Sequence, residues 1–308
     1  MGAIADGLDG PGGVPRKTPA NLLVATWNIA AFGGLAKGRW ETGPNDSPKR
    51  NLTNLCCIAE VISRFDVCAI QETKPELTAL RTLARALGPD WSFIVSDVTL
   101  GDPGNYERLS FVYDRRRVKA SGLVGEVVIP KEELGVKGSL DRQFARTPYA
   151  VSFTAGTKGF TLVTLHVLYG ETKAEKQRRA KELAKIAEWL DARANEPDEF
   201  NRNLIALGDF NIDRRDDPYW LAFASTGLGA PIPLQEARRN IAASSGGTDK
   251  YYDQIAWFQD GNRAKLTLEY IAAGSFLWTD YILQGMTNPS KKARISDHYP
   301  LWVEFRRN

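Results

Sequence analysis

The amino-acid sequence predicts an α/β protein in which two β-sheets are covered by helices. Amphipathic helical patterns and short apolar strand patterns both occur along the 308 residues, without the strict alternation of strand and helix that a parallel sheet requires. Several strand patterns follow one another between residues 91 and 167, and Gly156-Thr-Lys-Gly159 between two of them is a hairpin signal. No internal repeat is visible. This mixture of hairpins and helices favours layered sheets beneath helices.

Short apolar runs, several of them bounded by turn residues, predict the strands. They lie at residues 22–26, 67–70, 91–95, 109–113, 124–129, 149–154, 160–167, 204–207, 252–258, 266–271 and 301–305.

Helices are predicted where apolar residues recur every three or four positions. Ser47-Pro48 supplies an N-cap and a first-turn proline for a helix that extends to about Ser63. A second helix begins near Pro75 and is stopped by Gly88-Pro89-Asp90. Residues 173–193 form a long amphipathic helix, and a short helix begins at Pro218.

The N-terminus and the rest of the chain differ in composition. Residues 1–20 are rich in Gly and Pro and lack the apolar core of a signal peptide, which predicts a flexible N-terminal segment. No later linker is long enough to separate domains. The segments that carry chemistry lie at the start, middle and end of the chain. If they form one site, residues 21–308 are a single catalytic domain.

The composition is that of an ordinary globular protein long enough to bury a full core, with 43% hydrophobic and 25% charged residues. No apolar stretch approaches the length of a membrane span. The cysteines Cys56, Cys57 and Cys68 lie in apolar segments, and we expect buried thiols rather than disulfides or metal ligands. A reducing compartment fits this pattern, so a cytoplasmic location is slightly favoured; secretion without disulfides is the alternative.

The net charge of +3 neither requires nor excludes a polyanionic partner. The positive charge is clustered at Arg115–Arg117, Lys176–Lys181, Arg214-Arg215 and Lys291–Arg294. Such runs are usually solvated faces. The alternative is that at least two of them line a nucleic-acid track.

Only two histidines occur, and each lies in a segment suited to phosphate chemistry. His166 ends a predicted strand, and His298 lies within Ser296-Asp297-His298-Tyr299-Pro300. Histidine titrates near neutrality and is the usual proton shuttle in catalysis. The second of these segments is the more specific, because such a polar string is hard to explain by packing.

Other polar residues also lie at or near the ends of apolar runs. They are Asn28, Glu72, Asp209, Asn211 and Asp253. Functional residues concentrate on loops held by a rigid scaffold, and such oxygen atoms suit a hard cation such as Mg²⁺, with Mn²⁺ or Ca²⁺ as substitutes. Taken singly, Asn28 is more often a turn residue, and Glu72 alone is ambiguous. The string Gly208–Asn211 fits a plain turn as well as it fits chemistry.

Four of these segments together resemble the motif set of the endonuclease/exonuclease/phosphatase superfamily, whose fold is that of deoxyribonuclease I. They are Trp27-Asn28, Gln71-Glu72, Gly208–Asn211 and Ser296–Pro300, in the family's order, and they cover roughly residues 20–308. The resemblance implies a four-layer α/β sandwich of two packed mixed sheets flanked by helices. It also implies a metal-dependent phosphodiesterase site at one end of the sheets.

The resemblance further implies residues for the metal and the phosphate. Glu72 resembles the family's metal-ligand glutamate, Asn28 the asparagine beside metal and phosphate, and Asp297 a further metal-binding carboxylate. Asn211 resembles the asparagine that contacts a phosphate oxygen. Arg146 is similar to the family's phosphate-contacting arginine.

Catalytic roles follow from the same resemblance. His298 resembles the histidine that acts on the scissile phosphate, and Asp253 the aspartate that orients it. Asp209, with the nearby Asn211, resembles the group that handles the nucleophilic water. His166 and Glu107 are similar to the second histidine of deoxyribonuclease I and its carboxylate partner.

The motifs differ between branches of the superfamily. Gln71–Lys74 resembles the apurinic endonuclease branch, but residues 167–171 lack that branch's Tyr-x-Pro-x-Gly element. His166 and Glu107 favour deoxyribonuclease I, although that enzyme's cysteines near Gly208–Asn211 are absent. The hypothesis is a monomeric, Mg²⁺-dependent endonuclease that hydrolyses DNA with low sequence selectivity by in-line attack of water.

Two alternatives stay open at this point. One is a phosphatase or phosphodiesterase for a small or lipid-linked phosphate ester, and the other is a binding protein that keeps the fold without turnover. Trp40, Trp257 and Trp278 could be surface aromatics for a lipid substrate, but we expect them in the core.

Overall fold

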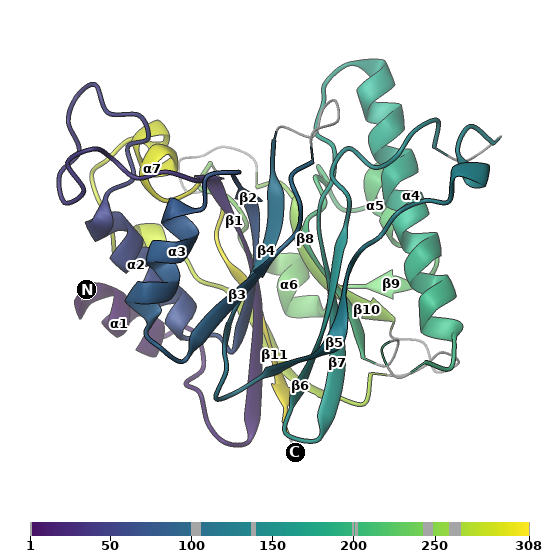
Figure 1. Ribbon diagram of the computed structural model, residues 1–308, viewed down its shortest axis with the longest axis horizontal. Coiled ribbons are helices and arrows are strands. Elements are labelled where there is room, and N and C mark those ends of the chain that lie inside the picture. Colours follow the sequence, from purple (N-terminus) through teal and green to yellow (C-terminus); the bar gives the residue numbers. More distant parts are fainter. Residues whose placement is uncertain are drawn as a thin grey trace.

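Two six-stranded sheets form the centre of the protein. A computed structural model describes residues 2–99, 106–136, 140–198, 200, 203–242, 249–258 and 266–307. Helices α1, α2 and α3 cover one sheet, and α4 and α5 flank the other (Figure 1). The predicted four-layer sandwich of two mixed sheets flanked by helices is therefore confirmed. No helix among the described residues is long and apolar enough to span a membrane.

The helices have the following bounds: α1 Gly2–Asp9, α2 Leu52–Ser63, α3 Thr78–Leu87, α4 Lys173–Asn195, α5 Pro218–Phe223, α6 Ile232–Glu236 and α7 Asn288–Arg294, with 3₁₀ turns η1 Lys131–Glu133 and η4 Trp278–Asp280. The strands are β1 Asn21–Phe32, β2 Val67–Thr73, β3 Trp91–Val95, β4 Arg108–Asp114, β5 Lys119–Glu126, β6 Tyr149–Ala155, β7 Lys158–His166, β8 Leu204–Asp209, β9 Leu228–Gly229, β10 Asp253–Phe258, β11 Glu269–Ser275 and β12 Leu301–Arg306.

Each sheet contains one parallel pair among antiparallel neighbours. The first sheet has the order β11-β12-β1-β2-β4-β3, and the second has the order β5-β6-β7-β8-β10-β9. The parallel pairs are β1–β2 and β7–β8, at the centre of each sheet. Of the residues that the sequence analysis selected, His166 and Asp209 end β7 and β8, Glu72 is the next-to-last residue of β2, and Asn28 lies within β1.

Two hydrophobic cores hold the layers together. Alternate residues of β1 point to opposite faces, so Leu22 and Val24 join the core shared with the second sheet, whereas Leu23 and Ala25 join the core beneath α1–α3. Both faces of this strand are buried, which explains its continuous apolar run. Because both sheets contribute to one inner core, residues 21–308 are suited to act as a single catalytic domain, which stays a prediction.

The structure corrects the prediction that residues 1–20 are a flexible segment. Residues 2–9 form helix α1, and Ile4, Leu8 and Val14 are buried in the core beneath α2. Ile4 and Leu8 are four residues apart and therefore lie on one face of the helix. The Gly and Pro content obscured this short apolar pattern.

Helix α2 begins later than predicted. Its N-cap is Asn51, and a capping box joins Asn51 and Asn54: each side-chain oxygen accepts from the other residue's backbone N–H, at 2.9 and 3.2 Å. Ser47 and Pro48 lie in the preceding loop. Asn51 and Asn54 satisfy backbone N–H groups at the start of the helix. The prediction that Ser47-Pro48 begins this helix was therefore wrong.

Two edge strands are also displaced from their predicted positions. Strand β5 ends at Glu126, whereas the prediction was 124–129, and β11 begins at Glu269 rather than residue 266. Both strands lie at sheet edges and are partly exposed, so their own patterns are weak. Val127 and Ile129 are apolar and buried although they lie just beyond β5. Their apolar pattern led to the wrong prediction of the strand's position.

The cysteines and tryptophans largely follow the expected burial. Cys57 and Cys68 are buried, and Cys56 is partly exposed. Trp257 and Trp278 belong to the cores, but Trp40 is 64% exposed and departs from the prediction.

Candidate active site

Strand pairing in the second sheet brings three predicted residues together. His166 at the end of β7 lies opposite Asp209 at the end of the parallel strand β8. Asp253 at the start of the antiparallel strand β10 lies opposite Asp209 on its other side. Since neighbouring strands are about 4.8 Å apart, this register places one imidazole and two carboxylates at one end of the sheet.

Gly208 makes the close pairing at this point possible. Its φ is +137°, and a Cβ there would lie 2.1 Å from the carbonyl oxygen of Leu165. Only glycine fits such an approach between backbones. Asp209 is thereby held against the end of β7.

The first sheet contributes Asn28 and Glu72. Asn28 pairs with Gln71 in the parallel β1–β2 register, and the register of β2 is irregular around Gln71 and Glu72 on both sides of the strand. Glu72 has a φ of +60°, which is uncommon for a residue with a Cβ. A bulge of this kind re-aims a side chain at a strand end, and here Glu72 Oε2 accepts from the N–H of Ala31 at 2.8 Å.

The loop before β12 places His298. The hydroxyl of Ser296 donates to the carbonyl oxygen of Asn28 at 2.6 Å and accepts from the N–H of His298 at 3.0 Å. The indole N–H groups of Trp27 and Trp278 both donate to the His298 carbonyl oxygen at 3.0 Å. The backbone of His298 is therefore held by three side chains, those of Ser296, Trp27 and Trp278.

Asp209 of the second sheet contacts residues of both sheets. Its Oδ2 accepts from Asn28 Nδ2 at 2.9 Å, and its Oδ1 accepts from the N–H of Asn211 at 2.9 Å. The Nε2 atoms of His166 and His298 lie 3.6 and 3.9 Å from the same Oδ2. Asp209 is 2% exposed, so this carboxylate faces both imidazoles in a largely water-free setting.

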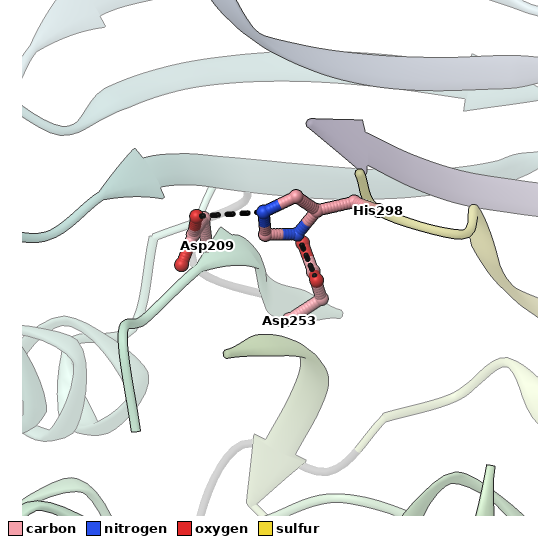
Figure 2. Close-up of side chains that lie close together, drawn as sticks. All are labelled: Asp209, Asp253 and His298. Atoms are coloured by element: carbon pink, nitrogen blue, oxygen red, sulfur yellow. Dashed lines mark hydrogen bonds and ion pairs between the residues drawn. The ribbon is translucent and has the colours of Figure 1, made fainter. Parts of the chain in front are cut away.

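His298 lies between two carboxylates (Figure 2). Its Nδ1 is 2.6 Å from Asp253 Oδ2, and its Nε2 faces Asp209. Burial alone would lower the pKa of His298, but the carboxylates of Asp253, Asp209 and Asp297 outweigh it and raise that pKa above its usual value. The imidazole is therefore held as a cation that can donate a proton from Nε2.

His166 has a carboxylate partner of its own. Glu107 Oε2 lies 2.9 Å from His166 Nδ1 and 2.6 Å from Arg146 Nε, and Glu107 Oε1 lies 3.1 Å from Lys74 Nζ. Burial acts to raise the pKa of Glu107, but His166, Arg146 and Lys74 outweigh it and lower that pKa to about 2. Arg146 Nη1 also donates to the carbonyl oxygens of His166 and Val167, at 3.4 and 3.3 Å, which fixes the plane of its guanidinium.

The lowered pKa of Glu107 makes a prediction for stability. Its pKa is about 2 in the folded protein against a usual 4.5, so its stabilisation is present above pH 4.5 and is lost as the pH falls towards 2. The difference in unfolding free energy between the wild type and Glu107→Gln should shrink by about 2 kcal/mol between pH 5 and pH 3. Urea unfolding at these pH values measures it.

Glu269→Gln is the matched control for this prediction, because Glu269 pairs with Arg306 at the surface, where ion pairs contribute little. A wild-type minus Glu107→Gln difference that is constant with pH would contradict the assignment.

Oxygen atoms suited to a hard cation lie beside this set. Asn28 Oδ1 is buried, and no donor in the described part of the chain reaches it. Asp297 pairs with Lys292, whose Nζ lies 2.6 Å from Asp297 Oδ2. Burial acts to lower the pKa of Lys292, but Asp297 and, to a smaller extent, Glu72 outweigh it and raise that pKa. An unpartnered amide oxygen and two nearby carboxylates match the ligand preference of Mg²⁺. The residue types thus fit a divalent ion.

Asp209, Asp253 and His298 also lie close enough together to hold a metal ion. Here, however, the imidazole Nδ1 already contacts Asp253, which is fully buried, and Asp209 accepts two hydrogen bonds. An ion at this point would have to displace these contacts.

Sequence reasoning missed the buried arginine behind the Asn28–Glu72 end of the site. Arg50 is 0% exposed and donates to the carbonyl oxygens of Ala30 and Ala31, which follow Asn28. It also donates to those of Arg294 and Ile295, which precede the Ser296–Pro300 loop. One guanidinium therefore joins the last part of strand β1 to the segment before the Ser296–Pro300 loop, although these lie near opposite ends of the chain.

Two further buried arginines support site residues in the same way. Arg179 donates to the carbonyl oxygen of Asn211 at 2.8 Å, and Arg239 donates to that of Asp253 at 2.9 Å. Arg179 belongs to the basic run Lys176–Lys181, so part of that run is structural rather than solvated. Fork-shaped guanidinium groups can satisfy several carbonyls at once, which is why arginine suits these positions.

Comparison with known proteins adds to this geometry. Residues 25–298 match the model of the "Endonuclease/Exonuclease/phosphatase family". The chain belongs to this family. A deoxyribonuclease of Thioalkalivibrio sp. (strain K90mix) is 27% identical over 300 residues, covering 96% of this chain and 74% of that protein. Members of the endonuclease/exonuclease/phosphatase family hydrolyse phosphate esters, generally with a divalent metal ion.

Solved structures agree on the fold. An endonuclease/exonuclease/phosphatase family protein of Bacteroides thetaiotaomicron matches with a TM-score of 0.58 at 18% identity, covering 95% of this chain and all of that one. A mannosyl-6-phosphatase of the same species matches at 0.57 and 16% identity, covering 92% and 99%. The human Nocturnin catalytic domain matches at 0.59 and 16% identity, covering 94% and 95%.

Proposed function

We propose that the protein is a divalent-metal-dependent endonuclease that hydrolyses DNA with low sequence selectivity. The observation that carries the proposal is the pair of histidines, each held at Nδ1 by its own carboxylate and each directing Nε2 at Asp209. The related deoxyribonuclease, which aligns with 96% of the chain, supports DNA as the substrate. The exposed Arg214 and Arg215, three and four residues after Asn211, add positive charge near the site.

Each residue has a role in in-line attack by water. Asn28, Glu72 and Asp297 would hold Mg²⁺, with Mn²⁺ or Ca²⁺ as substitutes, and the ion would offset negative charge on the phosphate. Asp209 is placed to accept a proton from the attacking water. As the water oxygen bonds to phosphorus, the bond from phosphorus to the leaving oxygen breaks. His298 donates a proton from Nε2 to that leaving oxygen, while Asp253 fixes the orientation of the imidazole.

The remaining residues bind the phosphate. The amide of Asn211, the guanidinium of Arg146 and the imidazole of His166 carry N–H groups that stabilise charge developing on the phosphate oxygens. Glu107 holds both Arg146 and His166 in place from behind. A monomer is sufficient for this arrangement, because one chain supplies every group.

A plasmid-nicking assay with Mg²⁺, Mn²⁺ and EDTA arms, run beside a panel of small and lipid-linked phosphate esters, tests the proposed function. We expect metal-dependent nicking that EDTA abolishes. Phosphate release from a small ester without nicking would indicate a phosphatase instead of an endonuclease. Retention of DNA without turnover of any substrate would indicate a binding protein.

Glu72→Gln should raise the Mg²⁺ concentration for half-maximal nicking by about tenfold or more, since it replaces a charged ligand with a neutral one. A Mg²⁺ titration of the nicking rate measures the effect. Glu76→Gln is the control, because Glu76 is an exposed carboxylate four residues further along the chain. If both variants need the same Mg²⁺ concentration for half-maximal nicking, the proposal that Glu72 binds the metal is contradicted.

A further inference from the structure

An exposed aromatic side chain lies in the segment that follows His166. Residues 167–171 depart from the apurinic endonuclease pattern, and Tyr169 within them is 46% exposed. The roles assigned above to metal, phosphate and proton transfer do not involve this residue. A half-exposed ring so close in sequence to His166 is available to a ligand.

The ring of Tyr169 is held rigidly despite its exposure. Its hydroxyl donates to the carboxylate of Glu171. The guanidinium of the buried Arg179 lies 5.3 Å from the ring centre, and Arg179 also donates to the carbonyl oxygen of Asn211. Tyr169 and the site residue Asn211 are therefore positioned by the same side chain.

A row of rings connects Tyr169 with the proposed proton donor. Tyr252 stacks on the imidazole of His298, with ring centres 6.0 Å apart and an angle of 30° between the planes. Tyr169 meets Tyr252 edge to face, with centres 6.2 Å apart. Tyr169 is thus two ring contacts from His298 and continues the site towards the surface.

The chemistry of Tyr169 favours a neutral, flat ligand group. Its hydroxyl is already engaged by Glu171, and the carboxylate of Glu171 next to it repels a phosphate. What the residue offers to a ligand is the exposed part of its ring. Nucleobases stack on such rings with about 1–3 kcal/mol per base and little dependence on sequence.

We infer that Tyr169 stacks a nucleobase of the nucleotide next to the scissile phosphate, an inference that rests on the proposed nuclease function. A base can reach an aromatic side chain only when it is free of duplex stacking. The substrate class is therefore DNA whose base is unpaired or splayed at the cleavage position. Stacking also explains binding without sequence selectivity, since every base has a π face.

Single-stranded oligonucleotides with one cleavable phosphodiester, their other linkages being methylphosphonates, test this inference. One substrate carries bases on both sides of the scissile linkage, a second is abasic on its 5′ side, and a third is abasic on its 3′ side. The wild type, Tyr169→Ala and Tyr169→Phe are compared by kcat/KM with Mg²⁺. Leu221→Ala is the control, because Leu221 on α5 is 61% exposed.

Tyr169→Ala should lower kcat/KM on the substrate with both bases by about 5- to 150-fold, the range to which the stacking energy of one base corresponds. Tyr169→Phe, which keeps the ring, and Leu221→Ala should stay close to the wild type. The loss in Tyr169→Ala should disappear on one of the two abasic substrates. An equal loss on all three substrates, or no loss on any, overturns the stacking role while the nuclease function stands. A wild type that cleaves neither these oligonucleotides nor a plasmid would overturn the nuclease function itself.

Discussion

His298→Ala is expected to lower kcat/KM for DNA cleavage by about 10²- to 10⁴-fold, the usual contribution of a positioned proton donor. His298 is the imidazole whose Nδ1 contacts Asp253 at 2.6 Å and whose Nε2 faces Asp209, and the carboxylates around it keep it protonated. Alanine removes the proton without altering the groups proposed to bind the metal. Initial nicking rates at saturating Mg²⁺ measure the effect.

Asp253→Asn is the companion variant, because it keeps the size of the side chain while removing the charge that orients and protonates His298. It should reproduce most of the loss in His298→Ala, and the double variant should be little worse than either single one. Thermal unfolding of each variant shows whether the fold is kept. A His298→Ala protein that is folded and within tenfold of wild-type activity would contradict the assignment.

Asp209→Asn is the second substitution with a large expected effect, again about 10²- to 10⁴-fold in kcat/KM. Asp209 accepts hydrogen bonds from Asn28 of the first sheet and from Asn211, and it faces both histidines, so it joins groups from both sheets. Asparagine preserves its shape but cannot take a proton from water. Single-turnover cleavage of a labelled oligonucleotide isolates this step from product release.

The matched control for Asp209→Asn is Asp213→Asn, four residues later in the same segment. Asp213 pairs with Lys250 and Arg179 and contacts neither histidine in the described structure. Its loss should be small beside that of Asp209→Asn. Equal losses in the two variants would mean that the effect arises from the segment as a whole rather than from proton transfer at Asp209.

The predictable part of the site consists of residues at the first or last position of a strand. His166, Asp209 and Asp253 lie on three neighbouring strands, and their register alone brings them together. Strand ends are visible in a sequence because apolar runs stop there. Family resemblance then supplied the roles that a pattern of strand ends cannot give.

The unpredicted part depends on contacts between distant segments. Arg50 and Arg239 look like ordinary surface residues in the sequence, yet each is buried against carbonyl oxygens of site loops. Arg179 lies within a basic run and is likewise buried. Burial of an arginine requires carbonyls from separate elements to converge, and no local pattern records that convergence.

Packing of the two sheets and the chemistry of the site depend on the same residues. Asn28 from the first sheet donates to Asp209 from the second, and Gln71 next to Asn28 donates to Thr164 of β7 at 2.9 Å. These buried polar contacts fix the two sheets in one arrangement, because a shift would leave amide and hydroxyl groups unsatisfied. The site is therefore as well ordered as the interface between the sheets.

The central claim is that the cation and the proton-transfer groups occupy separate, adjacent parts of one site. Anomalous scattering from a crystal soaked with Mn²⁺ and a short oligonucleotide tests it most directly. We expect a Mn²⁺ peak coordinated by Glu72 and Asn28 Oδ1, with a phosphate within hydrogen-bond distance of His298 Nε2. A peak coordinated instead by Asp209, Asp253 and His298, with none beside Glu72, would contradict the account.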